Sequence, residues 1–194
     1  MTALFRPAVA APRTAVLVVA AGCAALTGRP LLVAAIGAGP AMVFTVLFGV
    51  LLAVSLLWPA AADRPPETAA ATAGVLPVVA LGVGAFVVGR LLLAGSPPPA
   101  PATALVVALN TLAAVAEEAF FRRLVYGALL AGGPGLALGG SALLFAAVHV
   151  TVYGLWVLPL DLAAGLLFGW QRQVTGSWAV PAVTHAAANL LVVI

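Results

Sequence analysis

Two adjacent carboxylates and two histidines lie inside long apolar stretches of this chain. The carboxylates are Glu117 and Glu118, and the histidines are His149 and His185. An ionisable side chain at bilayer depth costs from about 2.5 to more than 10 kcal/mol. Only five of the 194 residues are acidic, so two of them in one apolar stretch indicate a functional requirement. The pattern predicts a polar site inside a membrane, and the residue types favour catalysis.

The chemistry open to these residues is water activation. A carboxylate and an imidazole that face each other can deprotonate a water molecule. A further pair, His185 and Asn189, offers N–H donors to a developing oxyanion. The sequence contains no matching serine or cysteine nucleophile motif, no HExxH zinc motif and no glycine-rich phosphate loop. Water is therefore the expected nucleophile, and hydrolysis of an amide bond fits the residue set.

Helical spacing organises these residues, because residues four apart share one face of a helix. Three pairs have this spacing: Glu118 with Arg122, Phe145 with His149, and His185 with Asn189. We expect Arg122 to neutralise Glu118. Glu117, about 100° further round the helix, escapes that pairing and stays available for chemistry.

The composition indicates that membrane helices carry these residues. Hydrophobic residues make up 64% of the chain and charged residues 7%, and the mean hydropathy of +1.23 excludes a soluble domain. No segment alternates with period two over about ten residues, which excludes an outer-membrane barrel. The net charge of +3 fits arginines in loops at a membrane face and gives no reason to expect nucleic acid. The single Cys23 excludes an intramolecular disulfide and a cysteine-based zinc site.

The expected fold is an all-α, polytopic transmembrane bundle. A membrane span needs about 20 apolar residues, and on this basis we expect about seven spans, with six and eight as alternatives. The expected spans are 14–28, 31–59, 72–95, 102–131, 135–152, 154–170 and 178–194. The second span is interrupted at residues 37–40, and Arg29 beside Pro30 is expected at an interface. We expect one integral membrane domain, 1–194, with motif-free spans in 1–101 and the catalytic helices in 102–194.

Depth in the membrane tests whether these residues can meet. The turn at 132–134 makes the fourth and fifth spans antiparallel, so Glu117 and His149 both lie about 20 Å from one membrane face. The last span starts from the same face and places His185 about 10 Å deep and Asn189 about 17 Å deep. All four side chains can therefore converge on one cavity.

The expected location is the plasma membrane, with several spans and a cytoplasmic N-terminus. Arg6 and Arg13 precede an apolar run as in a signal peptide, but further spans follow and we expect an uncleaved first helix. With seven spans, four arginines fall on the cytoplasmic side and two outside, which agrees with the positive-inside rule. The cytoplasmic set is Arg6, Arg13, Arg64 and Arg172, and the outer set is Arg29 and Arg90.

The ordered motifs resemble those of the CPBP family of intramembrane proteases, also called the CAAX-protease or ABI family, relatives of the Ras-converting endopeptidase. Residues 117–122 read as EExxxR, 145–149 as FxxxH and 185–189 as HxxxN. Residues 165–178 are also similar to the region of the family's third motif. The resemblance covers about 110–194.

The resemblance implies a role for each motif. Glu117 would act as the general base on water, with His149 assisting. Glu118 and Arg122 would support the helix and the charge balance. Phe145 is expected, from its residue type alone, to be a packing residue of the core. The HxxxN pair would stabilise the tetrahedral oxyanion.

Two features stay open. Asp161, in the sixth expected span, lies outside the family's pattern, and it either pairs with Arg123 or faces water. The expected enzyme needs no cofactor, because its polar residues come from separate helices. The alternative is a catalytic zinc held by Glu117, His149 and His185.

We therefore expect a glutamate-type intramembrane endopeptidase whose partners are the lipid bilayer and a protein or peptide substrate with a membrane-associated segment. The substrate candidates are a prenylated-type C-terminus, a bacteriocin-like peptide and a C-terminal sorting helix. The arginine-only, Ala/Gly-rich composition is typical of bacteria and disfavours the first. Two other functions remain: a non-catalytic immunity or scaffold protein, and a proton-coupled transporter that uses the same Glu and His residues. No paired inverted repeat supports transport.

Overall fold

The computed structural model describes residues 12–37, 39–59, 74–92 and 103–193, and every regular element in these ranges is helical. The α-helices are α1 (Pro12–Thr27), α2 (Arg29–Ile36), α3 (Pro40–Leu57), α4 (Val75–Leu92), α5 (Ala104–Glu118), α6 (Tyr126–Leu129), α7 (Pro134–Tyr153), α8 (Leu158–Thr175) and α9 (Ala179–Val193). A π-helix, η1 (Ala119–Val125), joins α5 to α6. Two short 3-10 helices are η2 (Leu130–Gly132) and η3 (Leu155–Val157). The predicted all-α class is confirmed.

Four helical segments within the described ranges are long and apolar enough to cross a membrane: α3, α4, the continuous stretch Ala104–Gly132, and α7. The helices α1 and α2 meet at a bend of 62° and give a fifth span if the pair is counted as one. The predicted number of about seven spans is not confirmed. The helix α9 is apolar as well, but its 15 residues are fewer than the 18 of the shortest spans above, and α8 has a charged residue in its first turn and another in its last.

Glycine and proline set the helix boundaries near the predicted positions. The second predicted span, 31–59, is two helices, because Gly37 ends α2 with a φ of 64° and Pro40 begins α3. A positive φ is accessible to glycine without steric cost, and proline suits the first turn of a helix. The turn between η2 and α7 uses the same pair of residue types, at Gly133 and Pro134.

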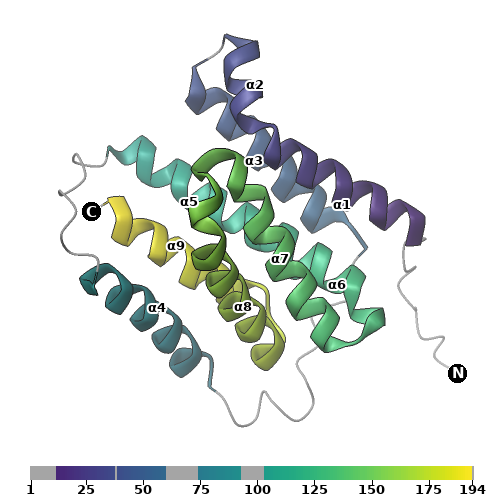
Figure 1. Cartoon of the computed structure of the whole chain (residues 1–194), viewed down its shortest axis with the longest axis vertical. Helices are drawn as coiled ribbons and strands as arrows, with labels where there is room; N and C mark the ends of the chain where they lie inside the picture. The colour runs from purple at the N-terminus through teal and green to yellow at the C-terminus, as the bar shows by residue number, and fades with distance from the viewer. Residues whose placement is uncertain (1–11, 38, 60–73, 93–102, 194) are drawn as a thin grey trace, which may run out of the picture.

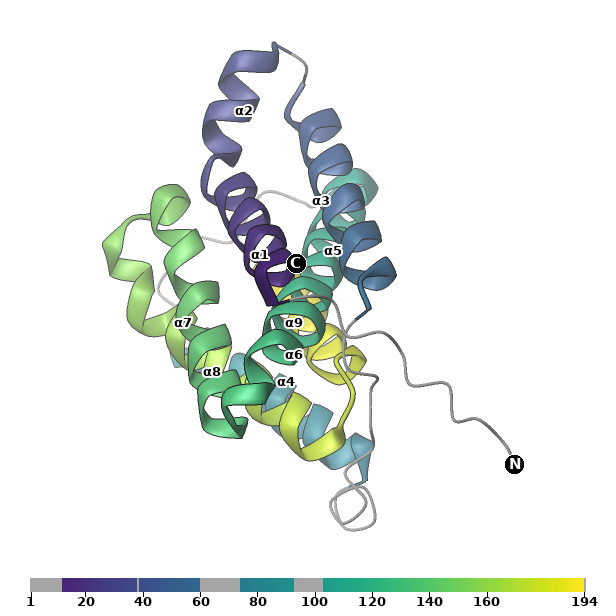
Figure 2. The same cartoon turned by 90° about the vertical axis from the view of Figure 1, so that its right-hand side faces the viewer.

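The bundle is built around α5, α7, α8 and α9 (Figure 1). In it, α7 packs on α8 and α5 on α9, while α4 lies against α9 and α3 against α5. Figure 2 shows α2 projecting at one end, beyond the helices that it connects. Large apolar side chains such as Leu57, Leu76 and Leu92 are more than four-fifths exposed, as a lipid-facing surface requires.

The apolar core lies around the π-helix. Its largest buried side chains are phenylalanines: Phe48, Phe120, Phe121, Phe145 and Phe168. They come from α3, η1, α7 and α8 and meet largely edge to face, with Phe121 and Phe145 at 5.4 Å between ring centroids. The packed core therefore joins the helices that carry the predicted site residues.

Candidate active site

The two carboxylates occupy the last two positions of α5, directly before the π-helix. Glu118 pairs with Arg122, one turn later: Arg122 Nε lies 3.1 Å from Glu118 Oε2, and Arg122 Nη1 donates to Glu118 Oε1 at 3.2 Å. Both side chains are fully buried. Arg122 Nη2 also donates to the carbonyl oxygen of Gly165 in α8, at 3.1 Å. The pair that helical spacing predicts is present, and it ties α5 to α8.

Aromatic rings enclose the Arg122 guanidinium. Its Cζ atom lies 4.6 Å from the ring centroid of Phe145 and 5.2 Å from that of Phe168. Such contacts are electrostatically favourable, more so when the cation is desolvated. Phe145 is buried, as its predicted packing role requires, and its ring touches both Arg122 and His149.

The residues of the HxxxN motif make contacts that the sequence did not predict. His185 Nδ1 lies 3.0 Å from Glu118 Oε1, so Glu118 has two cationic or donor partners, Arg122 and His185. Asn189 Nδ2 donates to the backbone carbonyl of Asn110 in α5, at 3.3 Å. These contacts fix α9 against α5.

Glu117 lies between two partners. Its Oε1 accepts a hydrogen bond from Arg29 Nη1 at 3.3 Å, and its Oε2 lies 3.7 Å from His149 Nε2. Arg29 belongs to α2 and is buried against other helices, so it takes part in the site; its predicted place at the outer membrane face stays a prediction. Arg122 is not a direct partner of Glu117, as the position of Glu117 on the helix predicts. Glu117 nevertheless has a counter-charge, the guanidinium of Arg29.

His149 uses its two ring nitrogens differently. Nδ1 lies 2.8 Å from the carbonyl oxygen of Phe145, one turn earlier. A carbonyl can only accept, so Nδ1 carries a hydrogen and Nε2 faces Glu117. The carboxylate of Asp161 lies on the Nδ1 side, with 3.7 Å between Oδ2 and Nδ1. This contact is too long for a direct hydrogen bond.

The structure tests one of the two alternatives for Asp161. Arg123 does not pair with it; its Nη1 donates instead to the backbone carbonyls of Ser55 and Trp58 at the end of α3. Asp161 lies in the first turn of α8, on the opposite side of His149 from Glu117.

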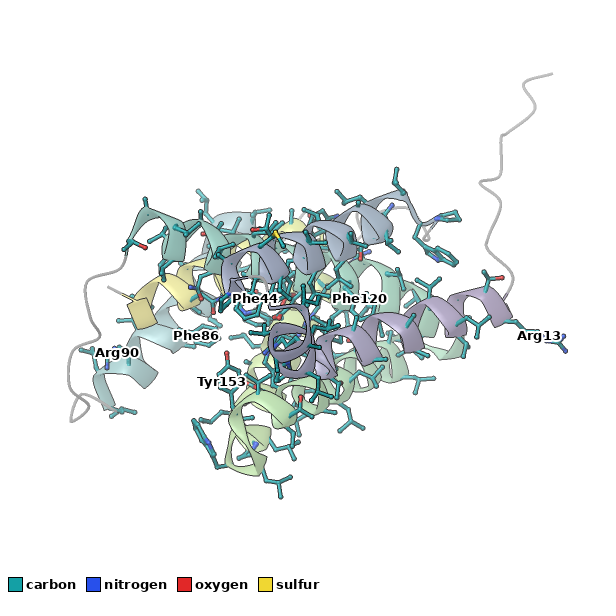
Figure 3. The ribbon with its side chains drawn as sticks, turned by 90° about the horizontal axis from the view of Figure 1, so that it is seen from above. Arg13, Phe44, Phe86, Arg90, Phe120 and Tyr153 are labelled. Carbon is teal, nitrogen blue, oxygen red and sulfur yellow. The ribbon has the colours of Figure 1, made fainter. Side chains whose placement is uncertain are left out.

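One cavity of about 180 Å³ connects the predicted catalytic residues. Its polar lining consists of Arg29, Asn110, Glu117, His149, Tyr153, His185 and Asn189, and Phe44 and Phe48 form an apolar wall. A neighbouring cavity of about 330 Å³ shares several of these residues and extends to Asp161 and Phe168. Two residues that line the first cavity, Phe44 of α3 and Tyr153 of α7, are labelled in Figure 3. All four residues predicted to converge therefore line one cavity.

The same cavity bears on the question of a metal. Among the described residues, no group of three or more His, Cys, Asp or Glu side chains has a metal-binding arrangement. His185 is directed at Glu118 through Nδ1, whereas His149 faces Glu117. The expectation that the reaction needs no metal stays a prediction.

Sequence reasoning missed Arg29 and Tyr153. Tyr153 stacks on His149, with 5.9 Å between ring centroids and 12° between planes, and Arg29 lies 6.0 Å from the Tyr153 ring. The only sequence signal for Arg29 was its charge between two apolar runs. Arg172, expected at the cytoplasmic face, has a buried side chain whose Nε donates to the backbone carbonyl of Arg122.

The fold and the site define a helical membrane protein with an acid–histidine cavity inside its bundle. Residues 99–191 match the family model described as "Type II CAAX prenyl endopeptidase Rce1-like". The matched region contains all three motifs, and the match supports the CPBP or CAAX-protease family and, with it, an endopeptidase of the CAAX type. No curated protein and no solved structure was found to match the chain.

Proposed function

We propose that this chain cleaves a peptide bond by direct attack of water, with Glu117 as the general base and His149 as its partner. The observation that carries the proposal is the spacing of 3.7 Å between Glu117 Oε2 and His149 Nε2. That distance is too long for a direct hydrogen bond, yet one water molecule can lie within hydrogen-bonding reach of both atoms. Both groups line the same cavity.

In this mechanism the water oxygen bonds to the scissile carbonyl carbon while Glu117 takes one of its protons. The carbonyl oxygen becomes an oxyanion, and collapse of the tetrahedral intermediate breaks the C–N bond. The proton held by Glu117, or shared with His149, passes to the leaving nitrogen as this bond breaks, so that a neutral amine departs. The Nδ1–Phe145 hydrogen bond supports this role, because it keeps the His149 ring oriented with Nε2 toward Glu117.

His185 and Asn189 are proposed to stabilise the oxyanion. His185 Nδ1 is directed at Glu118, so Nε2 is the nitrogen available to a substrate. An imidazolium at this position has Glu118 as its counter-charge and can donate from Nε2. Asn189 uses Nδ2 on the Asn110 carbonyl, and an amide group has a second N–H for the substrate. Preorganised donors of this kind are worth about 10²–10³ in kcat each.

The proposed substrate is a protein or peptide with a C-terminal or membrane-anchored segment. Support comes from the mixed lining of the cavity, which puts polar groups beside Phe44 and Phe48, and from the lipid-exposed surface around it. The family model's name refers to prenyl endopeptidases, so a lipid-modified C-terminus belongs among the substrates to be tested.

The test is a cleavage assay with purified protein in lipid nanodiscs, using a panel of membrane-anchored peptides and mass spectrometry of the products. We expect Glu117→Gln to lower kcat at least about 100-fold, the usual contribution of a general base. Gln173→Ala, an exposed change on α8, is the control and should cleave at the wild-type rate. A Glu117→Gln protein with full activity would overturn the mechanism. Full cellular function of Glu117→Gln would favour the non-catalytic scaffold.

A further inference from the structure

Arg29 reaches the site from a helix that carries none of the motifs. It is the first residue of α2, it lies outside the family match at 99–191, and it is the buried residue of that helix. Its Nη1 lies 3.3 Å from Glu117 Oε1, and both side chains are less than a tenth exposed. The contact joins residues 88 apart in the chain.

The two oxygens of Glu117 have different neighbours because of this contact. Oε1 accepts from Arg29, whereas Oε2 faces His149 Nε2. The terminal torsion of a glutamate is broad, so an unheld carboxylate samples many orientations. A guanidinium is planar and stays charged, which suits it to hold one carboxylate oxygen in a fixed place.

Arg29 also touches the other half of the dyad. Its Cζ lies 6.0 Å from the Tyr153 ring centroid, and that ring stacks on His149. Arg29, Glu117, His149 and Tyr153 therefore form a closed circuit of contacts around one wall of the cavity.

The other arginines near the bundle core have different partners. Arg122 pairs with Glu118, and Arg123 donates to the end of α3. Arg172 donates to a backbone carbonyl and lies over the Tyr126 ring. Among the described residues that line the cavity, Arg29 is the one arginine.

We infer that Arg29 is a positioning residue of the protease: its guanidinium holds Glu117 Oε1 so that Oε2 faces His149 and the attacking water. The inference rests on the proposed function. It gives α2 a role, because the bend of 62° after α1 brings the first residue of α2 to the cavity while the rest of the helix projects outward (Figure 2).

The test compares Arg29→Met and Arg29→Lys with the wild type, measuring kcat and KM separately. We expect Arg29→Met to lower kcat about 100-fold, as a misplaced catalytic group does, with KM changed less than about threefold. Lysine keeps the charge without the planar fork, and we expect it to restore about a tenth of the wild-type kcat. Arg123→Met is the matched control: it removes a guanidinium that bonds helix-end carbonyls outside the cavity, and we expect the wild-type kcat per folded molecule.

The outcomes separate three cases. Arg29→Met with the wild-type kcat would overturn the inference. If Arg29→Met and Arg29→Lys lose kcat equally, and in proportion to a loss of folded protein, then Arg29 only anchors α2. That result would also overturn the inference. A wild-type protein that cleaves none of the substrates would instead refute the proposed function, and the inference with it. Folded fractions are read by size-exclusion chromatography, and if Arg29→Met does not fold, Arg29→Gln replaces it.

Discussion

Breaking the Glu118–Arg122 pair should cost mainly stability, whereas replacing the neighbouring Glu117 should cost mainly activity. Arg122→Met removes a fully buried guanidinium that contacts both oxygens of Glu118 and the Gly165 carbonyl. Glu118 then stays buried with His185 as its remaining ionisable partner. Removing one partner of a buried ion pair costs about 3–5 kcal/mol, because the other charge is left uncompensated.

Glu117→Gln is the contrasting change. Glutamine has the same shape and keeps an acceptor for Arg29, and the Arg29 guanidinium lines the cavity, where water can solvate it, unlike the sealed Glu118–Arg122 pair. The loss is therefore the difference between a charge-assisted and a neutral hydrogen bond. That difference is about 1–1.5 kcal/mol. Glu117 also lines the cavity, where local rearrangement meets less resistance than in the packed core.

Thermal unfolding in detergent measures the contrast. At about 2–4 °C per kcal/mol for a chain of this size, Arg122→Met should lower the midpoint by about 6–20 °C and Glu117→Gln by less than about 6 °C. Cleavage should be lost in Glu117→Gln although the protein stays folded. Equal shifts of the midpoint in the two variants, with equal losses of activity, would refute the division of labour between Glu117 and Glu118.

Three further predictions concern the metal, the topology and the packing of the bundle. Exhaustively chelated protein should keep its kcat; stoichiometric zinc whose removal abolishes cleavage, and whose return restores it, would contradict this. A reporter fused to the C-terminus should lie outside the cytoplasm, whereas a cytoplasmic signal would require another number of spans or an inverted protein. Gly165→Ala should destabilise the protein by about 1–3 kcal/mol, since the added Cβ would lie 3.0 Å from the Ala142 Cα and separate α7 from α8. Gly139→Ala in α7, with open space around the new Cβ, is its control, and an equal loss in both would count against the packing argument.

Local features of the site were predictable from the sequence. The Glu118–Arg122 pair follows from four-residue spacing on one helix, and the breaks at Gly37 and Gly133 follow from the conformational freedom of glycine. The meeting of Glu117 and His149 follows from equal depth on two antiparallel spans. Each of these inferences needs only helix geometry and one turn.

Contacts between distant helices were not predictable in the same way. Arg29 meets Glu117 across 88 residues, and His185 meets Glu118 across 67. Depth alone places such residues at similar levels but does not say which side of a helix faces which neighbour. The rotation of each helix depends on the packing of Phe145, Phe168 and the small residues between helices, which one sequence does not reveal.

Two neighbouring arginines of the π-helix act on different parts of the bundle. Such a segment replaces the regular i→i+4 bonding with i→i+5 and frequently occurs at functional sites. Here it begins directly after Glu118, and Arg122 and Arg123 leave it toward α8 and α3 respectively. Backbone groups in a membrane must find partners inside the protein. The Arg172 side chain meets that requirement by donating to the carbonyl of Arg122 at 3.1 Å. The sequence pattern assigns Arg172 to a loop, but its buried side chain supports the irregular backbone of the π-helix. It thereby supports the position of the Glu118–Arg122 pair beside the proposed base.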